Sequence, residues 1–200
     1  MRMLAIAALT AALILITVSF VRVRAAKQTM PAVGQPAPAF TLPSQDGSPI
    51  SLASFRGKWV VLYFYPKDMT PGCTIEAHNF QRDLAQFEAR NAVILGVSED
   101  TPGSHQKFCT KDGLTFRLLA DTHHQVAAAY GSLGSFVGIP IARRNTFLID
   151  PTGRIAEVWT KVNPATASAQ VLAAIPVAVS SLSPAAPSPG GELLTARLAR

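Results

Sequence analysis

Two uninterrupted apolar runs stand out in the middle of the chain. Residues 59–65 read Trp-Val-Val-Leu-Tyr-Phe-Tyr, and residues 92–98 read Ala-Val-Ile-Leu-Gly-Val-Ser. Runs rich in β-branched and aromatic residues, with no alternation of polar positions, are typical of strands that are buried on both faces of a sheet. We therefore predict two central strands here, the first of which ends at Pro66.

A helical pattern follows each run and opens with the same start signal. The dipeptide Thr-Pro occurs at residues 70–71 and again at 101–102, and it combines a capping hydroxyl with a proline at the first helical position. Apolar residues then recur at helical spacing as far as Phe87. These signals predict helices over residues 71–89 and about 101–111.

Shorter elements complete the pattern and define the fold class. We predict short strands near residues 40–42, 50–52 and 114–119, a short helix at 123–130, an antiparallel hairpin of 144–149 and 154–159, and a last helix at 164–175. This order describes an α/β protein whose central mixed sheet starts parallel, ends antiparallel and carries helices on both faces. It is the order of a thioredoxin-like fold.

The N-terminal segment differs from this pattern. No residue from Met3 to Val21 is charged, and at about 1.5 Å per helical residue the stretch spans most of a bilayer's hydrocarbon. Residues 1–25 are therefore predicted to be a signal peptide or a transmembrane anchor. The anchor is favoured because the run exceeds the usual length of the hydrophobic region of a signal peptide. We expect a membrane-anchored or exported protein, in a bacterium the periplasm, although an anchor that faces the cytoplasm stays open because basic residues flank both ends.

The remaining boundaries follow from composition. Residues 26–32 are predicted to be a linker and residues 33–175 the folded domain. Residues 176–200, rich in Ala, Pro, Ser and Gly, are expected to form a disordered tail. Much of the net charge of +6 comes from basic residues at the two ends of the chain, so we expect no nucleic-acid partner.

The chain contains two cysteines, Cys73 and Cys109, and neither belongs to a C-x-x-C pair. This excludes a dithiol oxidoreductase motif and a cysteine-based zinc site. The four histidines, at 78, 105, 123 and 124, fit no metal-binding spacing, and we expect them to be solvated. No metal and no cofactor is predicted.

Cys73 is the candidate nucleophile. It lies in the first turn of a predicted helix, where unpaired amides and the helix dipole stabilise a thiolate, and Gly72 allows a small substrate to approach the backbone. The alternative is a buried structural cysteine. Thr70, three residues earlier, is expected to cap the helix with its hydroxyl, and the same group lies where it could bond the thiolate or a peroxide oxygen.

These residues carry a resemblance to a known family. The pattern Pro66-x-x-x-Thr70-x-x-Cys73 is similar to the peroxiredoxin active-site signature, and residues 62–77 resemble the subfamily called PrxQ or bacterioferritin comigratory protein. Further matches extend over residues 33–172. The resemblance implies a thiol-dependent peroxidase that reduces hydrogen peroxide and organic hydroperoxides in antioxidant defence and redox homeostasis.

The resemblance also implies roles for single residues. Cys73 would be the peroxidatic thiol, Thr70 its hydroxyl ligand, Pro66 the shield of its pocket and Arg144 the guanidinium beside it. An exposed strand-edge arginine is the alternative for Arg144. By strand alternation, we expect only one of Arg144 and its neighbour Arg143 to face the pocket.

A resolving cysteine is the point where this chain departs from many relatives. Those relatives place it five residues after the peroxidatic cysteine, where this chain has His78. Others use the following helix, so Cys109 is the candidate; its alternative is a buried apolar thiol. The implied Cys73–Cys109 disulfide requires the first helical turn to unwind, and thioredoxin or another dithiol would reduce it. Glu76 is expected to pair with a basic group in the pocket or with the helix dipole.

Two other functions remain open at this point. One is an exported thioredoxin-like thiol-disulfide oxidoreductase, which should carry the C-x-x-C motif. The other is a non-catalytic exported domain in which the two cysteines form a structural disulfide. For the peroxidase we expect a monomer or a weak dimer.

Overall fold

The computed structural model describes residues 29–177. The predicted signal peptide or anchor at residues 1–25 lies outside the described residues, as do the first part of the predicted linker and nearly all of the predicted tail. Within residues 29–177, every helix is too short or too polar to span a bilayer.

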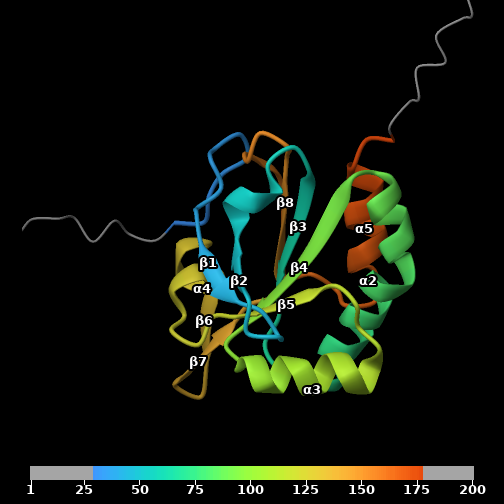
Figure 1. Cartoon of the computed structure of the whole chain (residues 1–200). Helices are drawn as coiled ribbons and strands as arrows, with labels where there is room; N and C mark the ends of the chain where they lie inside the picture. Colours follow the sequence, from blue (N-terminus) through green and yellow to red (C-terminus); the bar gives the residue numbers. More distant parts are fainter. Residues whose placement is uncertain (1–28, 178–200) are drawn as a thin grey trace, which may run out of the picture.

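A five-stranded sheet forms the centre of the molecule (Figure 1). Its strands, in spatial order, are β5 (Arg117–Ala120), β4 (Ala92–Ser98), β3 (Trp59–Phe64), β8 (Asn145–Ile149) and β9 (Ile155–Thr160). The pairs β3–β4 and β4–β5 are parallel, whereas β3–β8 and β8–β9 are antiparallel. The predicted mixed sheet, parallel first and antiparallel at its end, is confirmed.

Both faces of this sheet are buried, as the apolar run of β3 predicts. Val61 and Tyr63 contribute to one apolar cluster and Val60 and Leu62 to the other, because successive side chains of a strand point to opposite faces. The first cluster is completed by helices α2 (Pro71–Ala89), α3 (Pro102–Asp112) and α5 (Ala167–Ala174). The second is completed by β1 (Thr41–Pro43), its partner β2 (Pro49–Ser51), the 3-10 turn η1 (Leu52–Phe55) and α4 (Gln125–Ala129).

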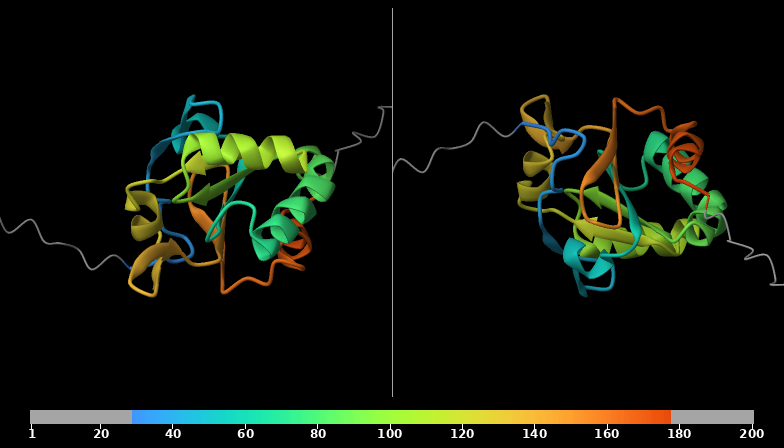
Figure 2. Two further views of the ribbon diagram at one scale, coloured as in Figure 1. Left: turned by 90° about the horizontal axis from the view of Figure 1, so that it is seen from below. Right: turned by 90° about the horizontal axis from the view of Figure 1, so that it is seen from above.

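The views in Figure 2 show the same layers from below and from above: α2 and α5 lie together on one side of the sheet, and α4 lies on the other. Strand β3 leads directly into the loop before α2. The start of α2 is therefore fixed at one end of the sheet, because β3 leads into it and α2 itself packs on the sheet through the same apolar cluster.

The helix boundaries agree closely with the sequence pattern. Helix α2 begins at Pro71 and α3 at Pro102. The hydroxyl of Thr101 accepts a hydrogen bond from the Ser104 amide, as a capping residue should. Helix α3 ends at Gly113, which adopts φ 65°, a left-handed conformation that costs glycine little.

Other boundaries differ from the prediction for local reasons. The hairpin of β6 (Leu133–Phe136) and β7 (Ile139–Ala142) was not predicted, because its turn contains Val137 at φ 49° rather than a residue that favours this conformation. Helix α5 begins three residues later than Pro164, after a turn in which the Asn163 side chain accepts a hydrogen bond from the Ala165 amide.

Candidate functional site

Cys73 occupies the first turn of α2 and is almost completely buried, with 1% of its surface exposed. The loop that precedes it, residues 66–70, leaves the end of β3 and turns through Met69 at φ 58°. The sulfur therefore lies where the free amides at the start of α2 meet the apolar core.

Thr70 contacts this sulfur directly. Its hydroxyl lies 2.9 Å from Cys73 Sγ and 3.0 Å from the carbonyl oxygen of Lys67. The expectation that this hydroxyl caps the helix is wrong: it makes no capping bond to an amide of the first turn. The sulfur and the carbonyl oxygen are the groups that it contacts instead.

A hydroxyl has one proton, so Thr70 can donate to only one of its two neighbours at a time. When Cys73 is a thiol, its S–H can donate to Thr70 while the hydroxyl donates to Lys67. When Cys73 is a thiolate, the hydroxyl can rotate and donate to the sulfur. The same side chain thus serves both protonation states without moving its oxygen.

Arg144 reaches the sulfur from the segment between β7 and β8, and its Nη2 donates to Cys73 Sγ at 3.1 Å. Arg143 points away, with its side chain against Gly134 near the β6–β7 hairpin. The expectation that only one of the two arginines faces the pocket is confirmed.

Gly72 makes the approach of this arginine possible. A Cβ atom at this position would lie 2.9 Å from Arg144 Nη2, so a larger residue would displace the guanidinium. The sequence suggested that Gly72 makes room for a substrate, and in the structure it makes room for Arg144.

Glu76, one turn after Cys73, is the second partner of Arg144. Its Oε2 accepts a hydrogen bond from Arg144 Nη1 at 2.6 Å. Of the two expectations for Glu76, a basic group in the pocket or the helix dipole, the structure shows the first. Glu76 is 1% exposed, and its other oxygen has no hydrogen-bond partner among residues 29–177. Burial raises the pKa of Glu76 to about 7, although the positive charge of Arg144 opposes the shift.

A single guanidinium is therefore shared between a sulfur and a carboxyl group. Arginine keeps its charge at any accessible pH, so protonation of Glu76 leaves that charge facing Cys73 alone. The state of Glu76 thus adjusts the electrostatic field at the sulfur without any change in the contacts of the sulfur itself.

Pro66 and Cys109 are the other two predicted site residues, and neither makes one of the contacts to the Cys73 sulfur described above. Pro66 is half-buried directly after β3, and its role as a shield stays a prediction. Cys109 lies on α3, 7% exposed, in the same apolar cluster as Cys73, and both cysteines are free thiols. Burial, together with the charge of Asp68, raises the pKa of Cys109 to about 11.

The expectation of solvated histidines is wrong for His105. This side chain is completely buried, and its Nδ1 lies 2.9 Å from Asp68 Oδ2. Its position was detectable in principle, because His105, Phe108 and Cys109 share one face of α3 at helical spacing. By contrast, His78 is exposed, and its Nε2 lies 3.0 Å from Asp112 Oδ1.

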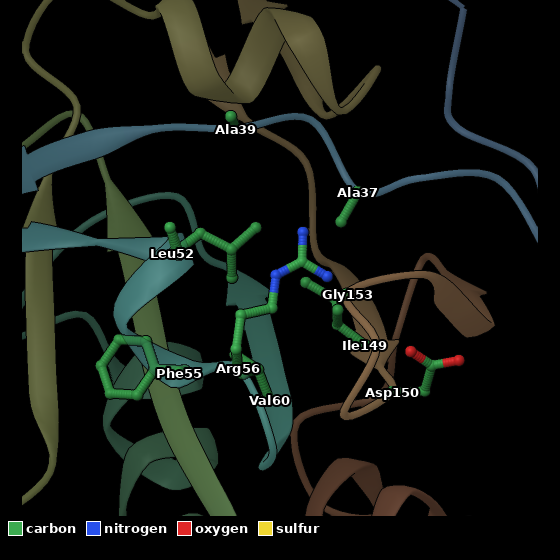
Figure 3. Close-up of a pocket in the computed structure, with 10 residues that line it drawn as sticks. Ala37, Ala39, Leu52, Phe55, Arg56, Val60, Ile149, Asp150 and Gly153 are labelled. Atoms are coloured by element: carbon green, nitrogen blue, oxygen red, sulfur yellow. The ribbon is translucent and has the colours of Figure 1, made fainter.

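A separate pocket lies on the other face of the sheet (Figure 3). It is lined by apolar residues of the N-terminal segment, η1, β3 and β8, with Arg56 and Asp150 as its charged side chains. Asp150 already accepts hydrogen bonds from the Thr152 and Arg154 amides. No cysteine, serine, threonine, lysine or histidine side chain lines this pocket, so it offers no candidate nucleophile comparable with Cys73.

Comparisons with known proteins show the family of the chain. Residues 33–158 match the model of the AhpC/TSA family. The chain belongs to the AhpC/TSA family. It is 44% identical over 137 residues to peroxiredoxin Bcp of Bacillus subtilis, a match that covers 65% of this chain and 85% of that protein. Peroxiredoxin Bcp of Escherichia coli is 41% identical over 130 residues, covering 63% and 83% of the two chains.

Solved structures of AhpC/TSA proteins show the same fold. A cysteine-to-serine mutant of Xylella fastidiosa PrxQ superimposes with a TM-score of 0.69 at 35% identity, covering 72% of this chain and 95% of that one. Peroxidoxin BcpB from Mycobacterium tuberculosis gives 0.69 at 31% identity, covering 74% and 97%. Proteins of the Bcp/PrxQ kind are thiol-dependent peroxidases, and this member of the family is an oxidoreductase of that class.

Glu76→Gln is expected to remove a pH dependence of stability. A carboxyl group whose pKa is higher in the folded than in the unfolded chain stabilises the fold fully below the unfolded pKa, and this contribution is lost as the pH rises through the folded pKa. For Glu76 these values are 4.5 and about 7. Between them, the free energy of unfolding of the unmodified protein should fall relative to the variant by up to about 3 kcal/mol.

Urea titrations at several pH values measure this difference. Glu88→Gln, at an exposed carboxyl group of the same helix, is the matched control. Parallel stability curves for the unmodified protein and the Glu76 variant would contradict the assignment.

Proposed function

We propose that Cys73 reduces a hydroperoxide by direct attack of its thiolate on the O–O bond. The terminal oxygen is transferred to sulfur, which gives a cysteine sulfenic acid, and the remaining oxygen leaves as water or an alcohol. The observation that carries the proposal is the pair of donors at one buried sulfur, the Thr70 hydroxyl at 2.9 Å and Arg144 Nη2 at 3.1 Å.

These donors suit the charge that moves in this step. Negative charge passes from sulfur to the two peroxide oxygens, and preorganised donors near both positions stabilise it where water is excluded. In this proposal Arg144 favours the thiolate and orients the peroxide, and Thr70 bonds an oxygen of the substrate. Pro66, half-buried beside the pocket loop, limits the access of water.

We further propose that Cys109 resolves the sulfenic acid as a Cys73–Cys109 disulfide. Among the solved relatives are two cysteine-to-serine mutants of Xanthomonas campestris peroxiredoxin Q, and the two mutated positions have the same separation along the chain as Cys73 and Cys109. Both thiols of this chain lie in one apolar cluster, on separate helices. Local unwinding at the start of α2 would bring the sulfurs together.

Recycling then needs an external dithiol, and thioredoxin or a protein with similar chemistry suits this step. The resulting cycle would serve antioxidant defence, with hydrogen peroxide and organic hydroperoxides as substrates. A thioredoxin-like oxidoreductase is less well supported, because the first turn of α2 has no second cysteine beside Cys73.

Replacing the nucleophile tests the reaction. Cys73→Ser should reduce peroxide consumption to the uncatalysed rate, because a serine hydroxyl is not ionised near neutral pH and is a far weaker nucleophile. Peroxide loss is followed with dithiothreitol as the reductant. Cys109→Ser is the matched control, since it should still consume one equivalent of peroxide in a single turnover. Undiminished turnover by the Cys73 variant would reject the proposed reaction.

The resolving step has its own test. After one equivalent of peroxide, peptide mass spectrometry of the unmodified protein should find a Cys73–Cys109 disulfide. Cys109→Ser should instead accumulate sulfenic acid and, with excess peroxide, sulfinic acid at Cys73. Free Cys109 beside overoxidised Cys73 in the unmodified protein would count against this role.

We also propose that residues 1–25 direct the protein to a membrane or out of the cytoplasm. The uncharged stretch from Met3 to Val21 supports this. Cell fractionation, with the N-terminus of the recovered protein sequenced, distinguishes the outcomes. An intact N-terminus in the membrane fraction indicates an anchor, and a new one near residue 25 indicates a cleaved signal. An intact chain in the soluble cytoplasmic fraction would contradict both.

A further inference from the structure

A buried polar cluster joins the loop before Cys73 to the helix that carries Cys109. Asp68, in that loop, is 4% exposed and His105, on α3, is completely buried. Asp68 Oδ2 lies 2.9 Å from His105 Nδ1 and accepts a hydrogen bond from the Ser104 hydroxyl at 2.7 Å. The Tyr65 hydroxyl donates to Asp68 Oδ1 at 2.7 Å.

The two nitrogens of His105 have different surroundings. Nδ1 faces the carboxylate of Asp68, whereas Nε2 is buried and has no hydrogen-bond partner among residues 29–177. When the proton of a neutral imidazole lies on the nitrogen that faces a carboxylate, the other nitrogen carries a lone pair; for His105 that nitrogen is Nε2. A buried polar atom without a partner is costly for the fold, and such a group at the edge of an active site invites a functional explanation.

Cys109 follows His105 by four residues on the same face of α3. Side chains four residues apart on a helix are neighbours, and each leans toward the preceding turn. The thiol of Cys109 therefore lies over the turn that carries His105. Among residues 29–177, no hydrogen bond reaches Nε2 of His105 while both cysteines are free thiols, so proton transfer would have to accompany the movement that brings the cysteines together.

Cys109 needs a base if it is to act as a nucleophile. Its thiol is buried, and its pKa is raised to about 11 by desolvation and by the charge of Asp68, so at neutral pH only a very small fraction is thiolate. Around Cys73, Arg144 and Thr70 are donors engaged with the sulfur. The Glu76 carboxyl group is bound to Arg144 and lies on α2, not on the helix of Cys109. His105 presents a free acceptor on the same helix face as Cys109.

We propose that His105, oriented by Asp68, takes the proton of Cys109 when that thiol attacks the oxidised Cys73. This inference rests on the proposed resolving role of Cys109. Asp68 and Cys73 belong to one short stretch of chain, so the carboxylate that orients the base also ties the loop of Cys73 to the helix of Cys109.

The step balances without an added reagent. The Cys109 sulfur forms a bond to the Cys73 sulfur, and the S–O bond of the sulfenic acid breaks. The proton leaves Cys109 for Nε2 of His105 and then combines with the departing hydroxide to give water. The thiol is oxidised and the sulfenic sulfur reduced, so that one disulfide and one water result.

The other titratable groups around the cluster do not compete for this role. Burial raises the pKa of Tyr63 and of Tyr65 well above 10, so both are neutral donors. Burial also acts to raise the pKa of Asp68, but the hydrogen bonds from His105, Tyr65 and Ser104 act against it and the pKa is lowered. Asp100 accepts a hydrogen bond from the Asp68 amide at 2.8 Å.

The test separates the two chemical steps in the full chain. One equivalent of peroxide is added, samples are quenched with an alkylating agent, and mass spectrometry follows the loss of Cys73 thiol and the growth of the disulfide. His105→Asn is the informative variant, because an asparagine amide can keep the bond to Asp68 but has no acceptor at the position of Nε2. His78→Gln, at the exposed histidine with its own carboxylate partner, is the matched control.

The expected result has two parts. In His105→Asn the peroxide step keeps its rate, while disulfide formation at pH 7 slows by about 100-fold, the usual effect of losing a general base. The slowed rate should then rise about tenfold per pH unit, because hydroxide must replace the imidazole. The control should match the unmodified protein in both steps.

Each contrary outcome is decisive. An unchanged rate of disulfide formation in His105→Asn overturns the inference, and so does an equal slowing of both steps, which would indicate that His105 only holds the structure together. A slowed rate that does not change with pH also overturns it. If instead Cys109→Ser recycles as fast as the unmodified protein, the proposed resolving role itself fails, and that result is separate from all of these.

Discussion

The guanidinium of Arg144 is the group on which the rest of the site depends. It lies between the sulfur of Cys73 and the carboxyl group of Glu76, at 3.1 and 2.6 Å, in a place where a charge needs close partners. Two features of the fold allow Arg144 to reach these partners. Gly72 has no side chain to obstruct it, and the antiparallel pairing of β8 with β3 carries Arg144 to the end of the sheet where α2 begins.

A second polar centre lies on the same side of the sheet, around Asp68 and His105. The two centres are linked by one short loop, since Asp68 precedes Thr70 and Cys73 in the chain. One end of this loop is tied to α3 through Asp68, and the other is tied to Arg144 through the sulfur. In the proposed cycle, oxidation of the Cys73 thiolate would remove the charge that binds Arg144 and so weaken only the second tie. The first turn of α2 would then loosen while the loop stays attached to the helix of Cys109.

The elements that the sequence predicted well are those with strong local signals. The apolar runs of β3 and β4, the Thr-Pro starts of α2 and α3 and the β8–β9 hairpin lie where the pattern places them. Errors occurred where a side chain contacts a different partner from the one that its local pattern suggests. The Thr70 hydroxyl turns to the sulfur instead of the helix amides, and His105 is buried because a carboxylate from another segment meets it.

By itself the sequence determined which cysteine stands at a helix start, because propensity, capping and proline position act within a few residues. It also determined the class of fold, because apolar periodicity reflects burial directly. Only the tertiary structure decided which side chains surround the sulfur. Arg144 and Cys73 lie 71 positions apart in the chain, and it is the register of the sheet and the packing of α2 on it, not any local preference, that bring them together.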